Sequence, residues 1–151
     1  MKKYLAQIIA TDYDGLQMIS ACSAGAKVKV ADIKYLESNR VFLLSINRTK
    51  VEKEQNDKKI NSICRFDFVE KVKSKNINQK NSDLILELIA IDYMKNGDAY
   101  EINLIFSDNA YISLTTETIE VRLEDQSEIK DKWKFLILII KISIKIWIIC
   151  F

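Results

Sequence analysis

The pattern of hydrophobic and polar positions predicts a chain built mainly of strands, with one helix near its start. A short apolar run over residues 4–11 is typical of a strand. Shortly afterwards Leu16, Ile19 and Cys22 recur at three-residue spacing, and a glycine follows where a helix would end. We therefore expect an amphipathic helix over residues 14–24 that covers one face of a sheet.

Beyond residue 26 the period changes to two, which is typical of strands. The expected strands are a hairpin over residues 26–36 and 40–47, and then 61–72, 84–93, 100–106 and 111–116. Residues 118–125 are compatible with a strand or a helix. In the strand over 61–72, Cys64, Phe66 and Phe68 share one face, which we expect in the core. The run over 84–93 is apolar on both faces, as in a central strand. This order predicts an α+β fold, with one early helix and a mostly antiparallel, curled sheet of six or seven strands in successive hairpins.

The last seventeen residues break this pattern, because fourteen of them are apolar. We therefore expect a single α+β domain over residues 1–130 and a hydrophobic, lysine-containing tail over residues 131–151. Four interpretations of the tail stay open. It is a frameshift or read-through into AT-rich sequence, a strand, a helix lying in an anionic membrane surface, or a helix of about 26 Å for which insertion into a membrane is close to break-even. In the third case the membrane contacts are Lys134, Lys141, Lys145 and Trp147.

The composition excludes several kinds of catalytic and binding site. The chain has 151 residues, enough for one domain, and it contains no histidine, which excludes catalysis and metal sites that depend on imidazole. Its three glycines are too scattered for a phosphate-binding loop, and its three cysteines have no metal-ligand or redox spacing. We therefore expect no metal and no cofactor. An odd number of cysteines without a secretion signal favours the cytoplasm.

Charge argues against a nucleic-acid partner. The net charge is +2, but the five lysines and one aspartate from Lys130 onward contribute +4, which leaves −2 for residues 1–129. The body of the protein therefore has no basic footprint of the kind that binds nucleic acid.

The candidate ligand-binding residues are Asn47, Arg48, Arg40 and Asp32. Asn47 and Arg48 end a predicted strand, and an arginine fork beside an amide can hold a carboxylate or a phosphate. The simpler interpretation is that Arg48 pairs with a carboxylate of the protein, such as Asp32 or Asp67. Cys22 and Cys64 lie on apolar faces, so we expect them in the core.

Several stretches, taken in order, resemble an alphaproteobacterial family of unknown function, DUF2948. The stretches are Ile9-Ala10 with Asp12, Asp14-Gly15-Leu16, Met18-Ile19-Ser20-Ala21, Asp32-Ile33-Lys34-Tyr35-Leu36, Arg40-Val41-Phe42, Asn47-Arg48, Arg65-Phe66, residues 86–91, residues 102–106, and residues 112–125. The resemblance covers residues 4–133 and leaves the tail outside. The resemblance implies a common fold and a cytoplasmic location, but it implies no activity.

Together these observations favour a non-catalytic module that binds a protein partner or a small ligand. The alternative is a peripheral membrane protein that is held at the membrane surface by residues 135–151. A histidine-free enzyme ranks third, because no pair of groups has a spacing that suggests a reaction.

Overall fold

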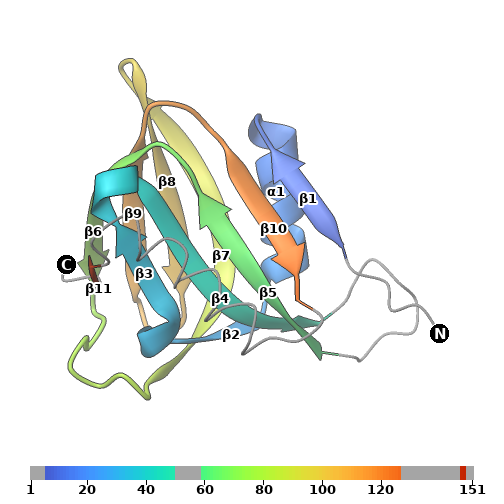
Figure 1. Ribbon diagram of the computed structural model, residues 1–151, viewed down its shortest axis with the longest axis vertical. Coiled ribbons are helices and arrows are strands. Elements are labelled where there is room, and N and C mark those ends of the chain that lie inside the picture. The colour runs from blue at the N-terminus through green and yellow to red at the C-terminus, as the bar shows by residue number, and fades with distance from the viewer. Residues whose placement is uncertain (1–5, 50–58, 127–146, 149–151) are drawn as a thin grey trace.

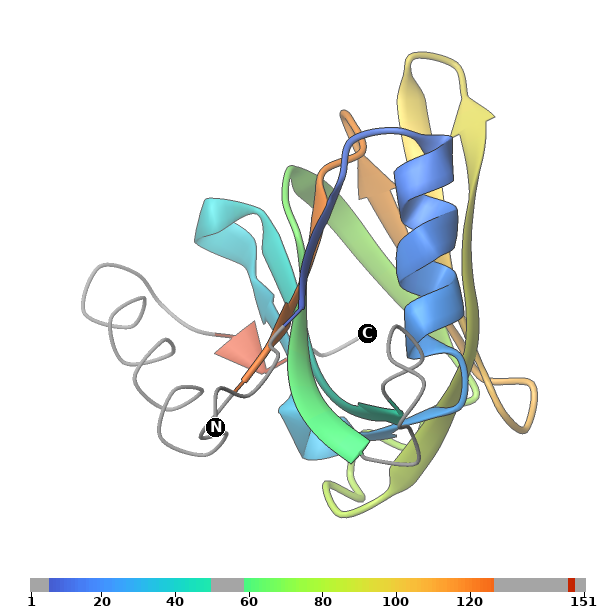
Figure 2. The same cartoon turned by 90° about the vertical axis from the view of Figure 1, so that its right-hand side faces the viewer.

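The computed structural model describes residues 6–49, 59–126 and 147–148. It shows one mostly antiparallel, strongly curled sheet with a helix beside it (Figures 1 and 2). In chain order the elements are β1 (Gln7–Ala10), α1 (Tyr13–Ser23), β2 (Ala26–Lys29), η1 (Val30–Asp32), β3 (Ile33–Leu36), η2 (Glu37–Asn39), β4 (Val41–Thr49), β5 (Lys59–Phe66), β6 (Val69–Lys75), β7 (Ile85–Asn96), β8 (Ala99–Phe106), β9 (Tyr111–Thr116), β10 (Val121–Asp125) and β11 (Trp147–Ile148), where η marks a short 3₁₀ turn.

The strands follow the order β1-β10-β5-β4-β2-β7-β8-β9-β6, with β3 beside β4 and β11 beside β3. The end strands β1 and β6 do not pair with each other, so the sheet is not closed. Figure 2 shows α1 between β1 and the β7–β8 hairpin, on the open side of the curl. The helix thus packs between β1 and β7, two strands that are not neighbours in the sheet.

The predicted number of six or seven strands was too low, because eleven are present in the described residues. Two of the predicted strands are each divided. The turn η1 separates β2 from β3, and the backbone at Phe68 separates β5 from β6. Phe68 has a positive φ of 60°, a conformation that reverses the alternation of side chains along a strand. As a result Phe68 is 38% exposed and lies outside the core, contrary to the prediction, whereas Cys64 and Phe66 are buried.

The other predicted elements are confirmed. β3 and β4 form the expected hairpin, β7 to β9 form two more, and the segment left open between strand and helix contains β10. The helix begins one residue earlier than predicted, after Asp12, whose side chain accepts a hydrogen bond from the Gly15 amide at 2.8 Å. An aspartate at this position satisfies an amide that the helix leaves free.

The buried side chains form two clusters on opposite faces of the sheet. The larger contains the apolar face of α1, Cys22 and Cys64 as predicted, and the edge-to-face pair Phe42 and Phe66 at 5.9 Å. The smaller contains Leu36, Val41, Leu43 and Ile63. Because neighbouring residues of a strand point to opposite faces, Phe42 and Leu43 assign the two clusters to opposite sides of β4.

The close contact between α1 and β1 generates a prediction for Gly15. A Cβ there would lie 2.9 Å from the Ala10 Cα, which is backbone and cannot give way easily. Alanine usually stabilises a helix by about 1 kcal/mol over glycine, but overpacking costs about 1–3 kcal/mol. We expect Gly15→Ala to lower the free energy of unfolding in urea, while Met18→Ala on the exposed side of the same helix leaves it nearly unchanged. A more stable Gly15→Ala protein would show that the helix is not held this tightly.

Candidate functional site

Arg48, one of the four predicted ligand-binding residues, lies in the interior. Its side chain is fully buried, as is that of Asp125, and the Arg48 Nη2 donates to Asp125 Oδ1 at 2.8 Å. The Arg48 Nε also donates to Ser62 Oγ at 3.0 Å, and Ser62 Oγ donates to Asp125 Oδ1 at 2.6 Å. The partner is therefore a carboxylate of the protein, as the simpler interpretation held, but it is Asp125 and not Asp32 or Asp67.

This ion pair joins elements that are far apart in the sequence. Arg48 Nη1 approaches the Cys22 carbonyl near the end of α1 at 3.5 Å, and the Ala6 amide before β1 donates to Asp125 Oδ2 at 2.8 Å. The network therefore connects α1 and the start of β1 to β4, β5 and β10. Its geometry supports a structural role, since both charged groups are already satisfied inside the protein.

The structure does not bring the four predicted residues to one place. Arg40 precedes β4 and Arg48 lies near its other end, about 26 Å away along an extended strand. Asn47 points to the opposite face from Arg48, and its amide donates to Asn61 at 3.0 Å. Asp32 is half-buried in η1, where desolvation raises the pKa of its carboxyl despite the nearby Lys29 and Lys34. A ligand-binding role for these residues stays a prediction.

Arg40 belongs to an exposed cluster where the chain passes from β5 to β6. Its guanidinium donates to Glu117 at 2.6 Å, lies 3.7 Å from Glu70, and stacks 5.9 Å from the ring centre of Phe68. The hydrogen bond from Arg40 lowers the pKa of Glu117. The Val69 amide donates to the Arg40 carbonyl at 2.8 Å, so the cluster accompanies the backbone turn at Phe68. Exposed pairs of this kind contribute little to stability.

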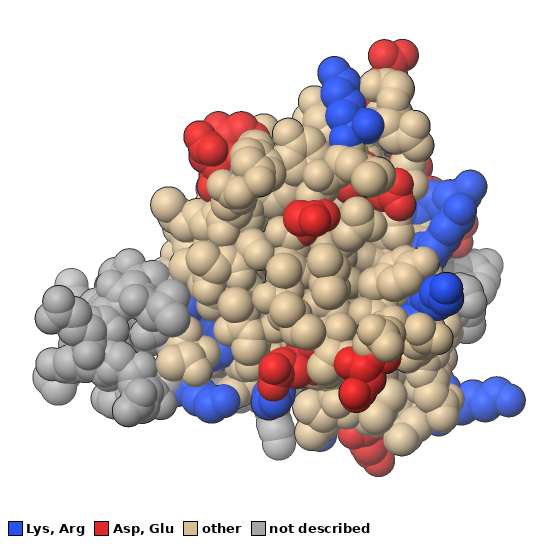
Figure 3. Space-filling model, turned by 180° about the vertical axis from the view of Figure 1, so that it is seen from behind, with Lys and Arg blue, Asp and Glu red and all other residues tan. Residues whose placement is uncertain are grey.

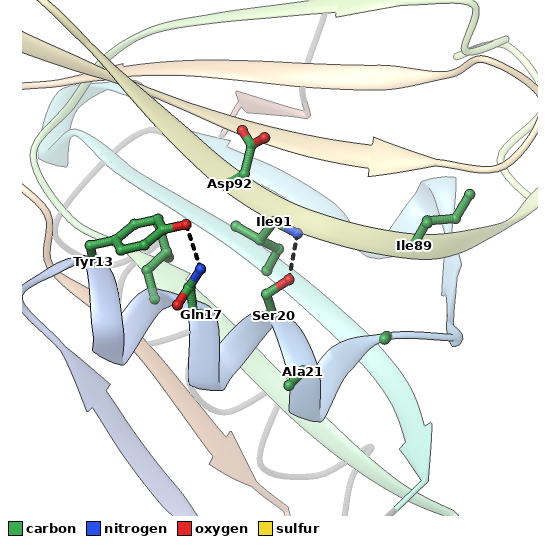
Figure 4. A pocket seen from close by; sticks show the side chains of 9 residues that line it. Tyr13, Gln17, Ser20, Ala21, Ile89, Ile91 and Asp92 are labelled. Carbon is green, nitrogen blue, oxygen red and sulfur yellow. Dashed lines mark hydrogen bonds between the residues drawn. The ribbon is translucent and has the colours of Figure 1, made fainter.

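The site that the structure favours is a groove of about 260 Å³ between α1 and β7. Its lining is Tyr13, Leu16, Gln17, Ser20, Ala21 and Ala24 from the helix side, and Ile89, Ile91 and Asp92 from the strand. Figure 4 shows the helix and the strand running side by side with these side chains between and beside them. Most of the lining is apolar, with a few polar groups, which is the usual composition of a binding site.

The groove exists because β7 loses its strand neighbour halfway along its length. β2 pairs with β7 only through residues 85–88, whereas the pairing with β8 continues to Asn96. At this point the register of β7 shifts, and Ile89 is the extra residue of a β-bulge. Beyond the bulge, the Ile91 amide donates to Ser20 Oγ of α1 at 2.9 Å (Figure 4). A helix side chain thus takes the place of a missing strand.

Aromatic and polar side chains surround the groove. The rings of Tyr13 and Tyr93 lie 5.2 Å apart, those of Tyr93 and Tyr100 lie 5.8 Å apart, and the Gln17 amide donates to the Tyr13 hydroxyl (Figure 4). On the far side, the exposed Asp92 carboxylate points away from α1. Among the described residues this carboxylate has no ion-pair partner. Asp92 is the one charged residue of the lining, and its carboxylate lies on the side of β7 away from the helix.

The face around the groove carries little charge. Figure 3 views the molecule from behind Figure 1, the side that carries α1 and the β7–β8 hairpin, and most of this face is uncharged. Carboxylates are scattered within it, and most lysines and arginines lie toward its outline (Figure 3). Ile89, Ile105 and Tyr111 are each at least 37% exposed. Ile105 lies opposite both Ala90 and Tyr111 in the register, so these apolar side chains continue across the outer face of β7, β8 and β9.

Sequence reasoning missed the groove, although two signals for it were present. Tyr13, Gln17, Ser20 and Ala24 are spaced as one stripe along a helix, beside the apolar stripe that identified the core face. The run over 84–93 is apolar on both faces, and this was attributed to burial on both sides. In the structure Ile85 and Ile89 are about half exposed. The pattern therefore predicted a buried position for apolar side chains that are partly exposed to solvent.

The predicted membrane contacts Lys134, Lys141 and Lys145 lie outside the described residues, and the backbone of Trp147 pairs with Tyr35 of β3. No helix within the described ranges is long and apolar enough to cross a membrane. The same ranges contain no cluster of acidic and cysteine side chains that could hold a metal ion.

Comparison with known proteins gives one result. The chain matches the family described as "Protein of unknown function (DUF2948)" over residues 6–134. No curated protein matches the chain, and no solved structure does.

The buried ion pair leads to a prediction about stability. Asp125→Asn and Arg48→Met should each lower the free energy of unfolding by about 3–5 kcal/mol, because each leaves a buried polar or charged group without its partner. The double variant buries no charge. Its loss in the free energy of unfolding should therefore be clearly smaller than the sum of the losses in the two single variants. Urea denaturation of the four proteins measures this coupling. Additive losses would mean that the two side chains do not act as a pair.

Proposed function

The chain belongs to the DUF2948 family, whose description assigns no activity, and we propose on the basis of the groove that it is a non-catalytic protein-binding module. In this proposal a protein partner inserts an apolar side chain between α1 and β7, and its neighbouring residues lie over the outer face of β7. The observation that carries the proposal is an apolar groove open to solvent on a face with little charge.

The size of the groove favours a protein partner over a free metabolite. Sites for small molecules enclose about 300–1,000 Å³ and bury most of the ligand. The groove measures about 260 Å³ and is open, so it suits one inserted side chain and leaves the rest of the ligand outside. The exposed apolar side chains Ile105 and Tyr111 extend the contact beyond the groove, as a partner's surface would need.

The charge around the groove specifies the partner further. Asp92 lies on its rim, and Glu101 lies on the same outer face of the hairpin, one row beyond Asp92 and Asn103. A basic residue next to the inserted apolar side chain would complement these carboxylates. The proposed partner therefore presents an apolar side chain, with an aromatic ring as the best match for Tyr13 and Tyr93, flanked by lysine or arginine.

Nuclear magnetic resonance of the full-length protein tests this proposal with two synthetic probes. The first is the capped tripeptide acetyl-Lys-Phe-Lys-amide, and the second is acetyl-Phe-amide, which has the same ring without the charges. Both should shift the methyl resonances of Ile89, Ile91 and Ala21 in a saturable way. Asp92→Asn should weaken binding of the tripeptide by about two- to five-fold, which is the contribution of an exposed ion pair. Binding of the uncharged probe should not change.

A pair of variants on one helix provides the control. Ala21→Phe places a ring in the groove and should abolish both sets of shifts, whereas Met18→Phe adds the same ring at an exposed position outside the lining and should not. Undiminished binding by Ala21→Phe, or shifts only at residues remote from α1 and β7, would contradict the proposal.

A further inference from the structure

The end strand β6 has a strand neighbour on one side only. Among the described residues it pairs with β9 alone, and Figure 1 shows it at the opposite margin of the sheet from β1. An edge strand directs every second backbone N–H and C=O away from the sheet. These groups can form a ladder with another extended chain, so β6 can accept one more strand.

The free part of this edge begins after Val69. The Val69 amide donates to the Arg40 carbonyl at 2.8 Å, and the Val69 carbonyl accepts from the Tyr35 hydroxyl at 2.9 Å, so both backbone groups already have partners. From Lys71 to Lys75, the described residues form no backbone hydrogen bond to β6 other than those from β9. The open edge therefore extends over residues 71–75, about 17 Å along the strand.

Three lysines share one face of this open edge. Lys71, Lys73 and Lys75 alternate along β6, and all three are exposed. Within the described part of the chain none of them has an ion-pair partner. Their neighbours across β9 are uncharged, namely Thr115, Ser113 and Tyr111. The sheet thus presents a row of positive charges that it does not neutralise itself.

The other face of the same strand is apolar at Val72. This side chain is partly buried and packs against the larger cluster. A strand added beside β6 would place its residues alternately next to the lysines and next to Val72. The edge therefore fits a chain in which carboxylates alternate with apolar side chains. A second copy of β6 does not fit, because it would place lysine opposite lysine.

We propose that β6 is a docking edge for an extended acidic segment of a protein partner, in which aspartate or glutamate alternates with an apolar residue. The backbone ladder supplies the affinity, and the ion pairs with the lysines select the partner. This edge is separate from the groove, which lies between α1 and β7 and has Asp92 in its lining. The two surfaces therefore select segments of opposite charge.

Fluorescence polarisation of the full-length protein tests this proposal with the labelled peptide acetyl-Glu-Val-Glu-Val-Glu-amide. Binding should be saturable, and the triple variant Lys71→Gln, Lys73→Gln, Lys75→Gln should weaken it by about ten-fold or more, because each exposed ion pair contributes about two- to five-fold. The peptide acetyl-Lys-Val-Lys-Val-Lys-amide should not bind.

Two single variants provide the controls. Lys95→Gln removes an exposed lysine of β7 and should leave the affinity for the acidic peptide unchanged. Ala21→Phe places a ring in the groove and should also leave it unchanged, so that the result does not depend on the groove. Equal weakening by Lys95→Gln and by the triple variant would overturn the proposal, since the peptide would then respond only to the net charge.

N-methylation of the peptide distinguishes an added strand from attraction by charge alone. A strand on the edge bonds to β6 through every second residue, so methyl groups on the valine amides and on the glutamate amides should have unequal effects. One set should abolish binding and the other should be tolerated. The β6 amides between Lys71 and Lys75 that face the edge should also exchange more slowly when the peptide is bound.

Equal effects of the two methylated sets, or unchanged exchange in β6, would overturn the proposal. So would a single-stranded oligothymidine that binds at least as tightly as the peptide. A nucleic acid has no backbone ladder to pair with a strand, so this result would mark β6 as a general surface for anions.

Discussion

The fold depends on one buried charge, the guanidinium of Arg48, and on the carboxylate that neutralises it. A charged side chain without exposure is tolerated only when it is paired and hydrogen-bonded, and Arg48 meets this condition through Asp125 and Ser62. These groups come from β4, β10 and β5, and the same network reaches the carbonyl of Cys22 in α1 and the amide of Ala6 before β1. Each element on the open side of the sheet is thereby fixed to the strands in its middle. Apolar side chains in place of Arg48 and Asp125 would form none of these hydrogen bonds. The directional bonds of the pair therefore specify where α1 ends and where β1 begins.

The position of α1 matters because β7 has no strand neighbour on one side over its second half. β7 is paired on both sides as far as the bulge at Ile89, and beyond it one side faces the helix. A helix side chain can satisfy an edge amide, as Ser20 does for Ile91, but a helix cannot follow a strand as closely as another strand does. The remaining space is the groove. The proposed binding site is thus a consequence of where the pairing of β7 with β2 ends, and the scattered carboxylates on that face add a preference for a basic partner.

The alternation of apolar residues predicted the strands, the hairpins and the helix, because these features depend on local sequence. It did not predict the division at Phe68, since a positive φ at a phenylalanine follows from contacts with distant residues such as Arg40. The buried role of Arg48 was foreseen as one of two interpretations, but its partner was not, because Asp125 is 77 residues away and only the strand order β10-β5-β4 brings them together. Ile89 shows the limit of pattern analysis: the same apolar residue is consistent with a second buried face or with an exposed groove, and only the position of the helix decides between them.

The central claim is that α1 replaces a missing strand beside β7 and stays docked there, so that the groove is a permanent feature of the surface. Amide hydrogen exchange at Ile91 tests it most directly, because the hydrogen bond of that amide is to the hydroxyl of Ser20. If α1 is firmly docked, the Ile91 amide exchanges as slowly as the amides bonded between β7 and β8. Exchange at the rate of a free sheet edge would contradict the claim, since the helix would then leave β7 too often to maintain a binding site.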